Sequence, residues 1–539
     1  MTKKKRYALI GAGVFLSIAA VAIWIAAHKF AKSFEPYIRQ QAIEYLRTRF
    51  DCEVELAALR VNMPNMSALK LFRTRGRGVI VRVDGEGIAM RFEGRRDLPP
   101  LFTIKKFGFD VDLGAVLARE KTVRQVTLDG MEIHVPPKGE RPKLTKDESL
   151  GHSSADTDVI IEYVVINDAK LVLLPKKEGK APLQFDIHRV HLESAGKDVA
   201  MQYDAALTNA KPAGEILSRG TFGPWVAKEP GDTPLAGNYT FDDADLGVFK
   251  SIAGILHSTG SFSGTLSSVD VVGNASVPDF RLKISGNRVP LTTRFQVLVD
   301  GTNGDTILKP VVARLGATDF TTSGGVIKNE AEHRRAISLH VDMPKGYIQD
   351  LLRLAMKGKP FMSGRIRLKT KIDIPPLDGK VKDKLILDGR FDVIDGKFLS
   401  SKIQDKIDSL SRRGRGEPKN EAIDEVVSDM NGVFHLEDQV ISFKSLRFEV
   451  PGAQIELAGA YVFDGPIDFH GAMKLKAKVS ETMTGWKRWV LKPIDPFFSR
   501  EGAGTFLRIK VEGTADDPQF GLDRDRKKAE DHLQLMKPR

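Results

Sequence analysis

The stretch Ile366–Ile374, IRLKTKIDI, shows the pattern that decides the fold. Apolar residues and one threonine alternate in it with Arg367, Lys369, Lys371 and Asp373. Because successive side chains of a β-strand point to opposite faces, this stretch has one apolar face and one charged face. Such alternation is typical of an antiparallel sheet that has one side in solvent.

The same alternation recurs from about Asp51 to Asp523 and predicts a chain that is mainly β. Asp-Gly dipeptides separate many of these stretches and suit tight hairpins, because glycine accepts a positive φ. We therefore expect a long antiparallel meander. The apolar positions of the other predicted strands include Phe107, Phe109, Val111, Leu113, Met131, Ile133, Val135, Phe280, Leu282, Ile284, Phe295, Val297, Val299, Ile337, Leu339, Val341, Met343, Met473, Leu475, Ala477, Val479, Leu507, Ile509 and Val511. The Asp-Gly pairs are Asp84-Gly85, Asp129-Gly130, Asp300-Gly301, Asp388-Gly389, Asp395-Gly396 and Asp464-Gly465.

Four stretches with helical spacing interrupt this pattern: Phe34–Phe50, Asp245–His257, Pro344–Lys357 and Ser400–Leu410. The last begins at a serine that suits an N-cap. We expect these helices to cover sheet ends or part of an apolar face. For the first helix, a position on the membrane surface is the alternative.

An uncharged stretch near the start, Tyr7–Ala27, is long enough to cross a bilayer as a helix. It predicts an anchor with a cytoplasmic N-terminus and the bulk of the chain across the membrane, because basic residues precede it. A cleaved signal peptide is the alternative, but its apolar core is normally shorter, and His28, Lys29 and Phe30 make a poor cleavage site. A buried core helix does not explain the basic flank. The residues placed at this membrane interface are Lys3, Lys4, Lys5, Arg6 and Trp24.

A second membrane-interface candidate is Gly485–Arg500, GWKRWVLKPIDPFFSR, where Trp486 and Trp489 flank Lys487 and Arg488. Aromatic rings and cations together suit the headgroup region of a bilayer. The alternative is a helix that packs its tryptophans on the end of the sheet.

The composition limits the function classes. The chain has 539 residues, a net charge of +12 and a single cysteine, Cys52, so no intrachain disulfide can form. We assign most of the positive charge to a solvated surface and expect no nucleic-acid partner, because the anchor separates the bulk of the chain from nucleic acid. Pro136–Asp158, Ser411–Asn420 and Arg524–Arg539 are expected to be disordered, the first of them as a long exposed loop.

The sequence contains no reactive motif that we could recognise. It has no P-loop, nucleophile elbow or HExxH pattern, and no cysteine–histidine cluster with zinc spacing. His188 and His191 are three residues apart, so on a strand they point to opposite faces. We predict a protein that is not an enzyme, with no catalytic residue, no metal and no cofactor.

The order of these features resembles the AsmA-like family of envelope proteins. The anchor is followed by Phe34–Val61, FEPYIRQQAIEYLRTRFDCEVELAALRV, and later by Val123–Val135, VRQVTLDGMEIHV. The strongest likeness is in the last third, where a helix within Phe391–Arg413 precedes the Gly-punctuated hairpins of Gly432–Leu475. It ends in Gly504–Asp523, GTFLRIKVEGTADDPQFGLD. The resemblance spans nearly the whole chain, with loose motifs.

The resemblance implies an antiparallel sheet curled into a groove that binds phospholipid acyl chains. It implies an inner-membrane protein with its bulk in the periplasm, which contributes to lipid transport between membranes and to outer-membrane biogenesis. The expected partners are the inner membrane, phospholipids and other envelope proteins. We divide the chain into a cytoplasmic tip and anchor (1–30), an N-terminal AsmA-like region (31–340), an AsmA-like C-terminal region (341–523) and a charged tail (524–539).

The candidate groove residues are apolar positions of the predicted strands. A closed core in a scaffold for envelope or outer-membrane protein assembly is the alternative, because alternation alone fits both. The groove candidates are Phe107, Phe109, Ile337, Leu339, Ile366, Leu368, Ile372, Ile374, Phe448, Val450, Leu475, Leu507, Ile509 and Val511.

Overall fold

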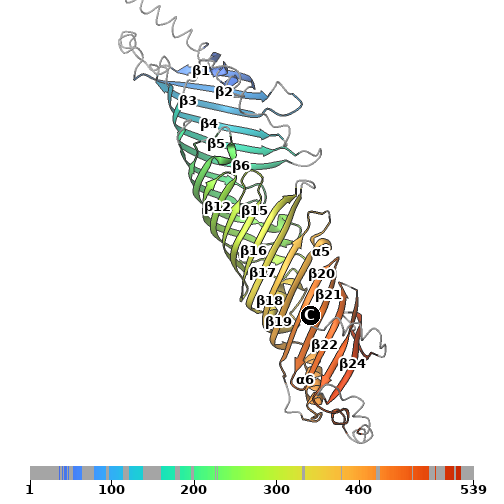
Figure 1. The fold of residues 1–539 in the computed structure, drawn as a ribbon. Helices are drawn as coiled ribbons and strands as arrows, with labels where there is room; N and C mark the ends of the chain where they lie inside the picture. The colour runs from blue at the N-terminus through green and yellow to red at the C-terminus, as the bar shows by residue number, and fades with distance from the viewer. Residues whose placement is uncertain are drawn as a thin grey trace, which may run out of the picture. The chain divides into compact units, whose positions relative to one another are not determined.

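A computed structural model describes most of the chain between residues 36 and 523 (Figure 1). The predicted anchor, the segment around Trp486 to Trp489 and the charged tail lie outside the described residues. No helix in the described part is long and apolar enough to cross a membrane. The described residues are 36, 39–40, 42–44, 46–47, 52–62, 78–92, 96–112, 121–136, 159–175, 182–195, 200–224, 226, 229–329, 334–377, 379–420, 425–463, 465–484, 492, 504–514 and 518–523.

The fold is mainly β, as predicted. Hydrogen bonding assigns 23 strands to one mixed sheet that does not close on itself. The chain divides into two compact units, and each is described by itself. Unit 1 contains Met1–Ala244 and Ser261–Ser267, and unit 2 contains Asp245–Gly260 and Ser268–Arg539.

Unit 1 is a row of long strands connected in chain order. Its elements are β1 (Cys52–Asn62), β2 (Ile80–Phe92), β3 (Phe102–Asp112), β4 (Lys121–Val135), β5 (Val159–Leu173), β6 (Leu183–Ala195), β7 (Met201–Thr208), β8 (Glu215–Phe222), the 3-10 turn η1 (Pro230–Asp232) and β9 (Pro234–Asp245).

The prediction of a wholly antiparallel sheet is wrong at one place, because β4 and β5 are parallel, with Val126 opposite Val164 and Ile133 opposite Leu171. Parallel neighbours need a long crossover, since the chain must return to the same edge before the second strand begins. The residues between Val135 and Val159 supply that length. The loop expected at Pro136–Asp158 falls in this connection; because 137–158 lie outside the described residues, it stays a prediction.

The core of unit 1 lies on β1, β2 and β3, where Val81 and Val83 are fully buried. Ile43 and Leu46, from the helix predicted over Phe34–Phe50, pack against this core. Arg39 of the same segment donates a hydrogen bond from Nη2 to the Leu56 carbonyl at 2.6 Å. These contacts support the interpretation that this helix covers the sheet.

Unit 2 continues as an antiparallel meander. Its elements are the 3-10 turn η2 (Leu246–Val248), β10 (Ile252–Ala253), β11 (Ile255–Thr265, shared with unit 1), β12 (Ser268–Val277), β13 (Arg281–Leu282), β14 (Leu291–Val299), β15 (Thr306–Leu315), β16 (Thr318–Asn329), β17 (Arg334–Tyr347), α4 (Ile348–Ala355), β18 (Met362–Ile374), α5 (Val381–Lys384), β19 (Ile386–Phe398), α6 (Ser401–Gly414), β20 (Ser428–Glu437), β21 (Val440–Val450), β22 (Ala453–Val462), β23 (Pro466–Leu475), the 3-10 turn η3 (Val479–Thr482), β24 (Thr505–Thr514) and β25 (Pro518–Leu522).

The helix predicted over Asp245–His257 is wrong. The stretch contains η2, the short strand β10 and the start of β11. The Asp245 carboxylate accepts a hydrogen bond from the Gly247 amide at 2.7 Å, which stabilises a turn. Gly254 has a φ of +139°, which no helical residue adopts.

Two predicted strands are shorter than expected. Of Phe280–Ile284 only Arg281 and Leu282 are extended, as β13, because a turn begins at Lys283. β23 ends at Leu475, so Ala477 and Val479 lie beyond it, the latter in η3.

Most of the Asp-Gly pairs are not turns. Asp300-Gly301 does connect β14 to β15, but four of the pairs lie inside strands: Asp84-Gly85 in β2, Asp129-Gly130 in β4, and Asp388-Gly389 and Asp395-Gly396 in β19. Asp464 lies outside the described residues. Gly85 shows why a glycine is needed within a strand, because a Cβ there would come within 2.0 Å of the Phe107 ring on β3.

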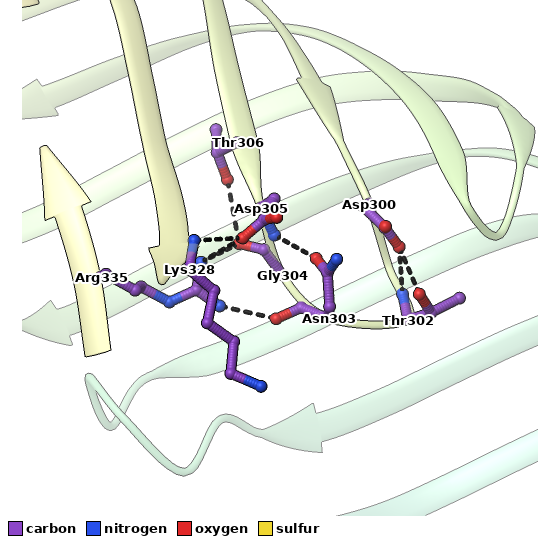
Figure 2. Close-up of polar contacts among 8 residues, drawn as sticks. All are labelled: Asp300, Thr302, Asn303, Gly304, Asp305, Thr306, Lys328 and Arg335. Carbon is purple, nitrogen blue, oxygen red and sulfur yellow. Dashed lines mark hydrogen bonds and ion pairs between the residues drawn. The ribbon is translucent and has the colours of Figure 1, made fainter. Parts of the chain in front are cut away.

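The turn between β14 and β15 is fixed by its own polar groups and by an arginine from β17 (Figure 2). Asp300 accepts hydrogen bonds from the Thr302 amide at 2.8 Å and from its hydroxyl at 2.6 Å, and these bonds lower the pKa of Asp300. Arg335 donates to the carbonyls of Gly304 at 2.6 Å and Asn303 at 2.7 Å. The guanidinium thereby ties this turn to the start of β17.

The two longest helices in the described part of unit 2 lie in connections at the same edge of the sheet. α4 joins β17 to β18, and α6 joins β19 to β20. Both were predicted, although α4 starts later than Pro344, which is still part of β17. α6 runs to Gly414, so the disorder expected from Ser411 is wrong at its start. Ser400 precedes α6 without making the expected side-chain cap.

Each of these helices carries one buried aspartate that accepts hydrogen bonds from a neighbouring strand or loop. Asp350 of α4 accepts from the Ala317 amide at 3.0 Å and from the Thr318 hydroxyl at 2.8 Å. Asp408 of α6 accepts from the amides of Val426 at 2.9 Å and Glu425 at 3.1 Å. The carboxylates therefore fix the helices on the edge of the sheet.

We expect Asp408→Ala to lower the free energy of unfolding by about 3 kcal/mol, because it leaves buried amide donors without an acceptor. Asp405→Ala, on the exposed side of α6, should change it by less than about 0.5 kcal/mol. Urea unfolding measures both, and hydrogen exchange of residues 425–437 should rise in the first variant alone. Equal stability of the two variants would contradict this role of Asp408.

Candidate functional site

The sheet of unit 2 has an apolar face that crosses several strands. Residues that lie opposite each other in hydrogen-bonded strands point to the same face, so the register of the strands identifies the side chains of this face. One row of opposed residues contains no charged side chain: Leu368, Phe391, Gly432, Leu446, Leu457, Gly471, Ile509 and Leu522. A second row is equally free of charge: Thr370, Gly389, Phe434, Phe443, Gly459, Phe469, Val511 and Phe520. The apolar face of unit 2 therefore extends from β18 to β25.

Unit 1 has an apolar face of its own. One row of register partners runs from β2 to β9: Val83, Phe109, Val126, Val164, Leu192, Tyr203, Gly220 and Gly237. The parallel pair β4–β5 keeps the same side chains together, because opposed residues of parallel neighbours also point to the same face. Both units therefore present the same kind of surface.

Aromatic rings fill the middle of the apolar face in unit 2. The Phe434 ring lies 6.2 Å from that of Phe391 and 6.5 Å from that of Phe443, and Phe443 lies 5.9 Å from Phe469. These rings lie beside glycines of neighbouring strands. A Cβ at Gly389 would come within 2.6 Å of Phe434, so only glycine leaves room for this ring. The phenylalanine rings therefore lie close to the backbone of the neighbouring strands and form an aromatic surface in the centre of the sheet.

The apolar face is partly open. A sandwich core would bury its side chains, yet Leu368, Ile372, Phe391 and Phe443 are only half-buried. The buried clusters of unit 2 lie at the helical edge instead. One joins Met343, Met362, Ile366 and Val393 with α4, and the other joins Val450, Ala453 and Leu475 with α6.

The structure places the groove candidates on the two apolar faces, in two kinds of environment. Ile366, Val450 and Leu475 lie in the packed clusters beneath the helices, and Val511 is buried on β24. The others are half-buried or, at Phe107 and Phe109, pack against the core of unit 1. Register opposes Ile337 to Ile374 and Leu339 to Ile372, so candidates from different strands are brought together. The interface candidates Lys3, Lys4, Lys5, Arg6, Trp24, Trp486, Lys487, Arg488 and Trp489 lie outside the described residues.

Sequence reasoning missed the aromatic centre. Phe434 and Leu436 follow Gly432 with the period of a strand, but Phe443 and Leu446 do not share that period. A bulge between them accounts for the break, because Phe443 opposes Gly459 whereas Leu446 opposes Leu457. The usable signal was the recurrence of glycine and phenylalanine at alternate positions of predicted strands.

The opposite face of unit 2 is polar, and many of its charged side chains form ion pairs. A hollow of about 1020 Å³ lies on it, lined by charged residues that include Lys369, Lys371, Asp388, Arg390 and His435. Lys369 pairs with Asp342 at 2.9 Å, and Lys371 pairs with Asp373 at 2.8 Å. These two lysines of the hollow therefore already have carboxylate partners.

His435 is a residue in this hollow whose titration near neutral pH should affect folding. Its Nδ1 lies 2.7 Å from Asp388 Oδ1 and its Nε2 lies 3.4 Å from Glu437 Oε2. The hydrogen bond to Asp388 is the main reason that the pKa of His435 is raised, and Glu437 adds to it.

A raised folded pKa means that the protonated histidine stabilises the fold at low pH. We expect this contribution to be complete below about pH 6.5, the usual pKa of histidine, and to disappear as the pH rises through the raised value. It should not exceed about 1 kcal/mol, because the pair is exposed. Urea unfolding of the wild type and His435→Gln should differ at pH 5.5 and converge above pH 8. A constant difference would contradict this assignment.

The comparisons with known proteins give no further guide. No known protein family, curated protein or solved structure matches this chain. The chemistry that the apolar face offers is therefore read from its own side chains. They are aliphatic and aromatic, with Thr370 as a polar exception in the second row, and they suit the non-covalent binding of hydrocarbon.

Proposed function

We propose that this protein binds phospholipid acyl chains on the apolar faces of its sheet. We further propose that it is anchored in the inner membrane with its bulk in the periplasm, and that it contributes to lipid transport between membranes and to outer-membrane biogenesis. The observation that carries the proposal is the uncharged, half-buried face of unit 2, whose rows cross β18 to β25. Soluble proteins rarely leave so extended an apolar surface in contact with water.

Acyl chains suit this face better than a polypeptide does. The backbone groups of the inner strands are already used in the ladder, so the face offers few donors or acceptors to the peptide groups of a partner. Hydrocarbon needs none. Burial of each CH₂ group is worth about 0.8 kcal/mol, so one acyl chain gains enough free energy to occupy part of the face.

The form of the face also suits movement of the lipid. The rows described above consist of many similar side chains, so the binding free energy would be spread over many small contacts. A chain displaced along a row exchanges one set of contacts for another of similar strength. A single deep pocket would instead hold the lipid at one position.

The proposed location rests on the sequence. The uncharged stretch Tyr7–Ala27 and the basic residues before it support an anchor with a cytoplasmic N-terminus. The inner membrane, the periplasm and the outer-membrane role come from the resemblance to AsmA-like proteins. Alkaline phosphatase fused after Arg539 should be active if the bulk of the chain is periplasmic, and an inactive fusion would contradict this orientation.

Photo-crosslinking tests the acyl-chain site directly. A photoreactive phenylalanine placed at Ile372, Phe443 or Ile509 should capture phospholipid in cells, because these side chains lie on the apolar face. The same group at Lys371, Ser442 or Arg508 should capture far less, because these neighbouring residues point to the polar face. Mass spectrometry of the crosslinked protein identifies the adduct.

Equal labelling of the two sets, or no lipid adduct at either, would overturn the proposal. Crosslinks from the apolar set to protein alone would instead favour the scaffold, in which a partner polypeptide covers the face. Each apolar position and its control are neighbours on the same strand, so the two differ mainly in the face of the sheet to which the side chain points.

A charge on the apolar face should reduce lipid binding. Ile372 is half-buried and stands between Leu339 and Leu387, so Ile372→Asp would place a carboxylate among hydrocarbon. We expect the purified variant to retain several-fold less co-extracted phospholipid than the wild type. Arg367→Asp, on the polar face of the same strand, should retain the wild-type amount. Circular dichroism of both variants checks the fold, and similar lipid content in both would contradict the proposal.

A further inference from the structure

A histidine and three carboxylates meet on the polar face of unit 2, where its last strands pair. His470 and Asp468 belong to β23, Glu512 belongs to β24, and Asp523 follows β25. His470 Nδ1 lies 2.9 Å from Asp523 Oδ2, and His470 Nε2 lies 2.9 Å from Asp468 Oδ1. Ligand atoms of Asp468, His470 and Glu512 all lie within 4.8 Å of one another.

The imidazole cannot satisfy both carboxylates in its neutral form. A neutral ring carries one N–H group, so it donates to one carboxylate and presents a lone pair to the other. With oxygens of both carboxylates at 2.9 Å, one ring lone pair faces a carboxylate, and a cation bound between them would relieve this repulsion. The side chain of His470 is only 6% exposed, so water cannot easily relieve the conflict.

The surroundings of the ring favour a metal ion at Nε2. The Asp523 side chain, which is 2% exposed, lies at Nδ1 and fixes the orientation of the ring. Histidine ligands of metals almost always donate their other N–H group to such an acceptor. Nε2 faces Asp468, and a ligand atom of Glu512 lies within 4.8 Å of those of His470 and Asp468, so these two carboxylates can supply the remaining ligand atoms.

His435 provides an internal comparison on the same face. It also stands between two carboxylates, but the contact to Glu437 is 3.4 Å and the ring is exposed. Within the described part of the chain, the group of three potential ligands is formed around His470 and not around His435. A buried ring with a third ligand distinguishes the His470 cluster from an ordinary ion pair.

We propose that His470 Nε2, Asp468 and Glu512 bind a divalent transition-metal ion, with Zn²⁺ as the best match, while Asp523 orients the histidine. One imidazole and two carboxylates form a ligand set that zinc accepts, and a water molecule completes four-coordination. Glu512 must turn toward the ion, because Lys510 Nζ lies 2.6 Å from its Oε2. Lys510 and the metal ion therefore compete for the same carboxylate.

The ion would connect the final strands of the sheet. Its ligands come from β23 and β24, and the Asp523 carboxylate connects the residue after β25 to the same histidine. Metal binding should therefore stabilise this edge of unit 2. The inference does not depend on lipid binding, because all four side chains lie on the polar face or beyond the last strand.

Metal titration of the full-length, detergent-purified protein after dialysis against a chelator tests the site. We expect the wild type to bind one equivalent of Zn²⁺ by calorimetry, and Co²⁺ to give the visible absorption of a four-coordinate ion. Asp468→Asn should weaken binding about tenfold or more while the fold persists, since this side chain is 65% exposed. Asp388→Asn, which removes the carboxylate beside His435, is the matched control and should bind as the wild type does.

The competing lysine gives a variant that should gain affinity. Lys510→Met frees Glu512 and should tighten Zn²⁺ binding several-fold. Lys371→Met removes a lysine from a similar pair two residues apart on β18 and should leave Zn²⁺ affinity unchanged. A gain of affinity cannot arise from general unfolding, so this pair remains informative if Asp468→Asn proves unstable.

Absence of Zn²⁺ and Co²⁺ binding at micromolar concentrations would overturn the proposal, as would wild-type affinity in both Asp468→Asn and Glu512→Gln. One-to-one binding that is weakened by Asp468→Asn and strengthened by Lys510→Met would establish the site.

Discussion

The hydrogen-bonded register of the strands is the constraint on which the other features depend. A slip of one residue between neighbours would move every side chain of a strand to the opposite face. In unit 2 that slip would place Lys369 and Lys371 on the apolar face and Leu368 and Ile372 among the ion pairs. The ladder therefore determines both the apolar rows and the polar pairs, such as Lys369 with Asp342.

Bulges test this constraint, because each adds a residue to one strand of a pair and would invert the faces if the sequence did not change with it. In β21 the residues of the apolar face are odd-numbered from Ile441 to Phe443 and even-numbered from Leu446, and the bulge lies between them. In β15 the numbering of the apolar face changes in the opposite direction, from even at Leu308 to odd at Val311. The alternation in the sequence breaks where the backbone does, so the apolar face remains uninterrupted.

Period-two alternation made the fold class predictable, and it placed Ile366 to Ile374 on the correct strand. It could not reveal the direction of β5, because alternation is the same in parallel and antiparallel strands. Local turn chemistry failed at Gly85 and Gly389, where the need for glycine comes from a phenylalanine on another strand. The helix predicted over Asp245–His257 failed because apolar spacing of three and four also fits two short extended pieces around Gly254. The cluster around His470 was not visible either, since its ligands come from strands whose pairing the sequence does not state.

The edges of unit 2 explain why its apolar face is covered at one side and open at the other. α4, α6 and η3 stand in connections at the edge where Met362, Val450 and Leu475 are buried. Several of the opposite ends of these strands are joined by short connections, such as Asp438 and Gln439 between β20 and β21, which are too short to fold back over the sheet; the connection between β18 and β19 is longer and contains α5. A helix covers the ends of a few strands, whereas the half-buried residues near Ile372 and Phe443 lie farther along the same strands. The arrangement therefore stabilises the sheet at one edge and leaves hydrocarbon contacts available along the rest of it.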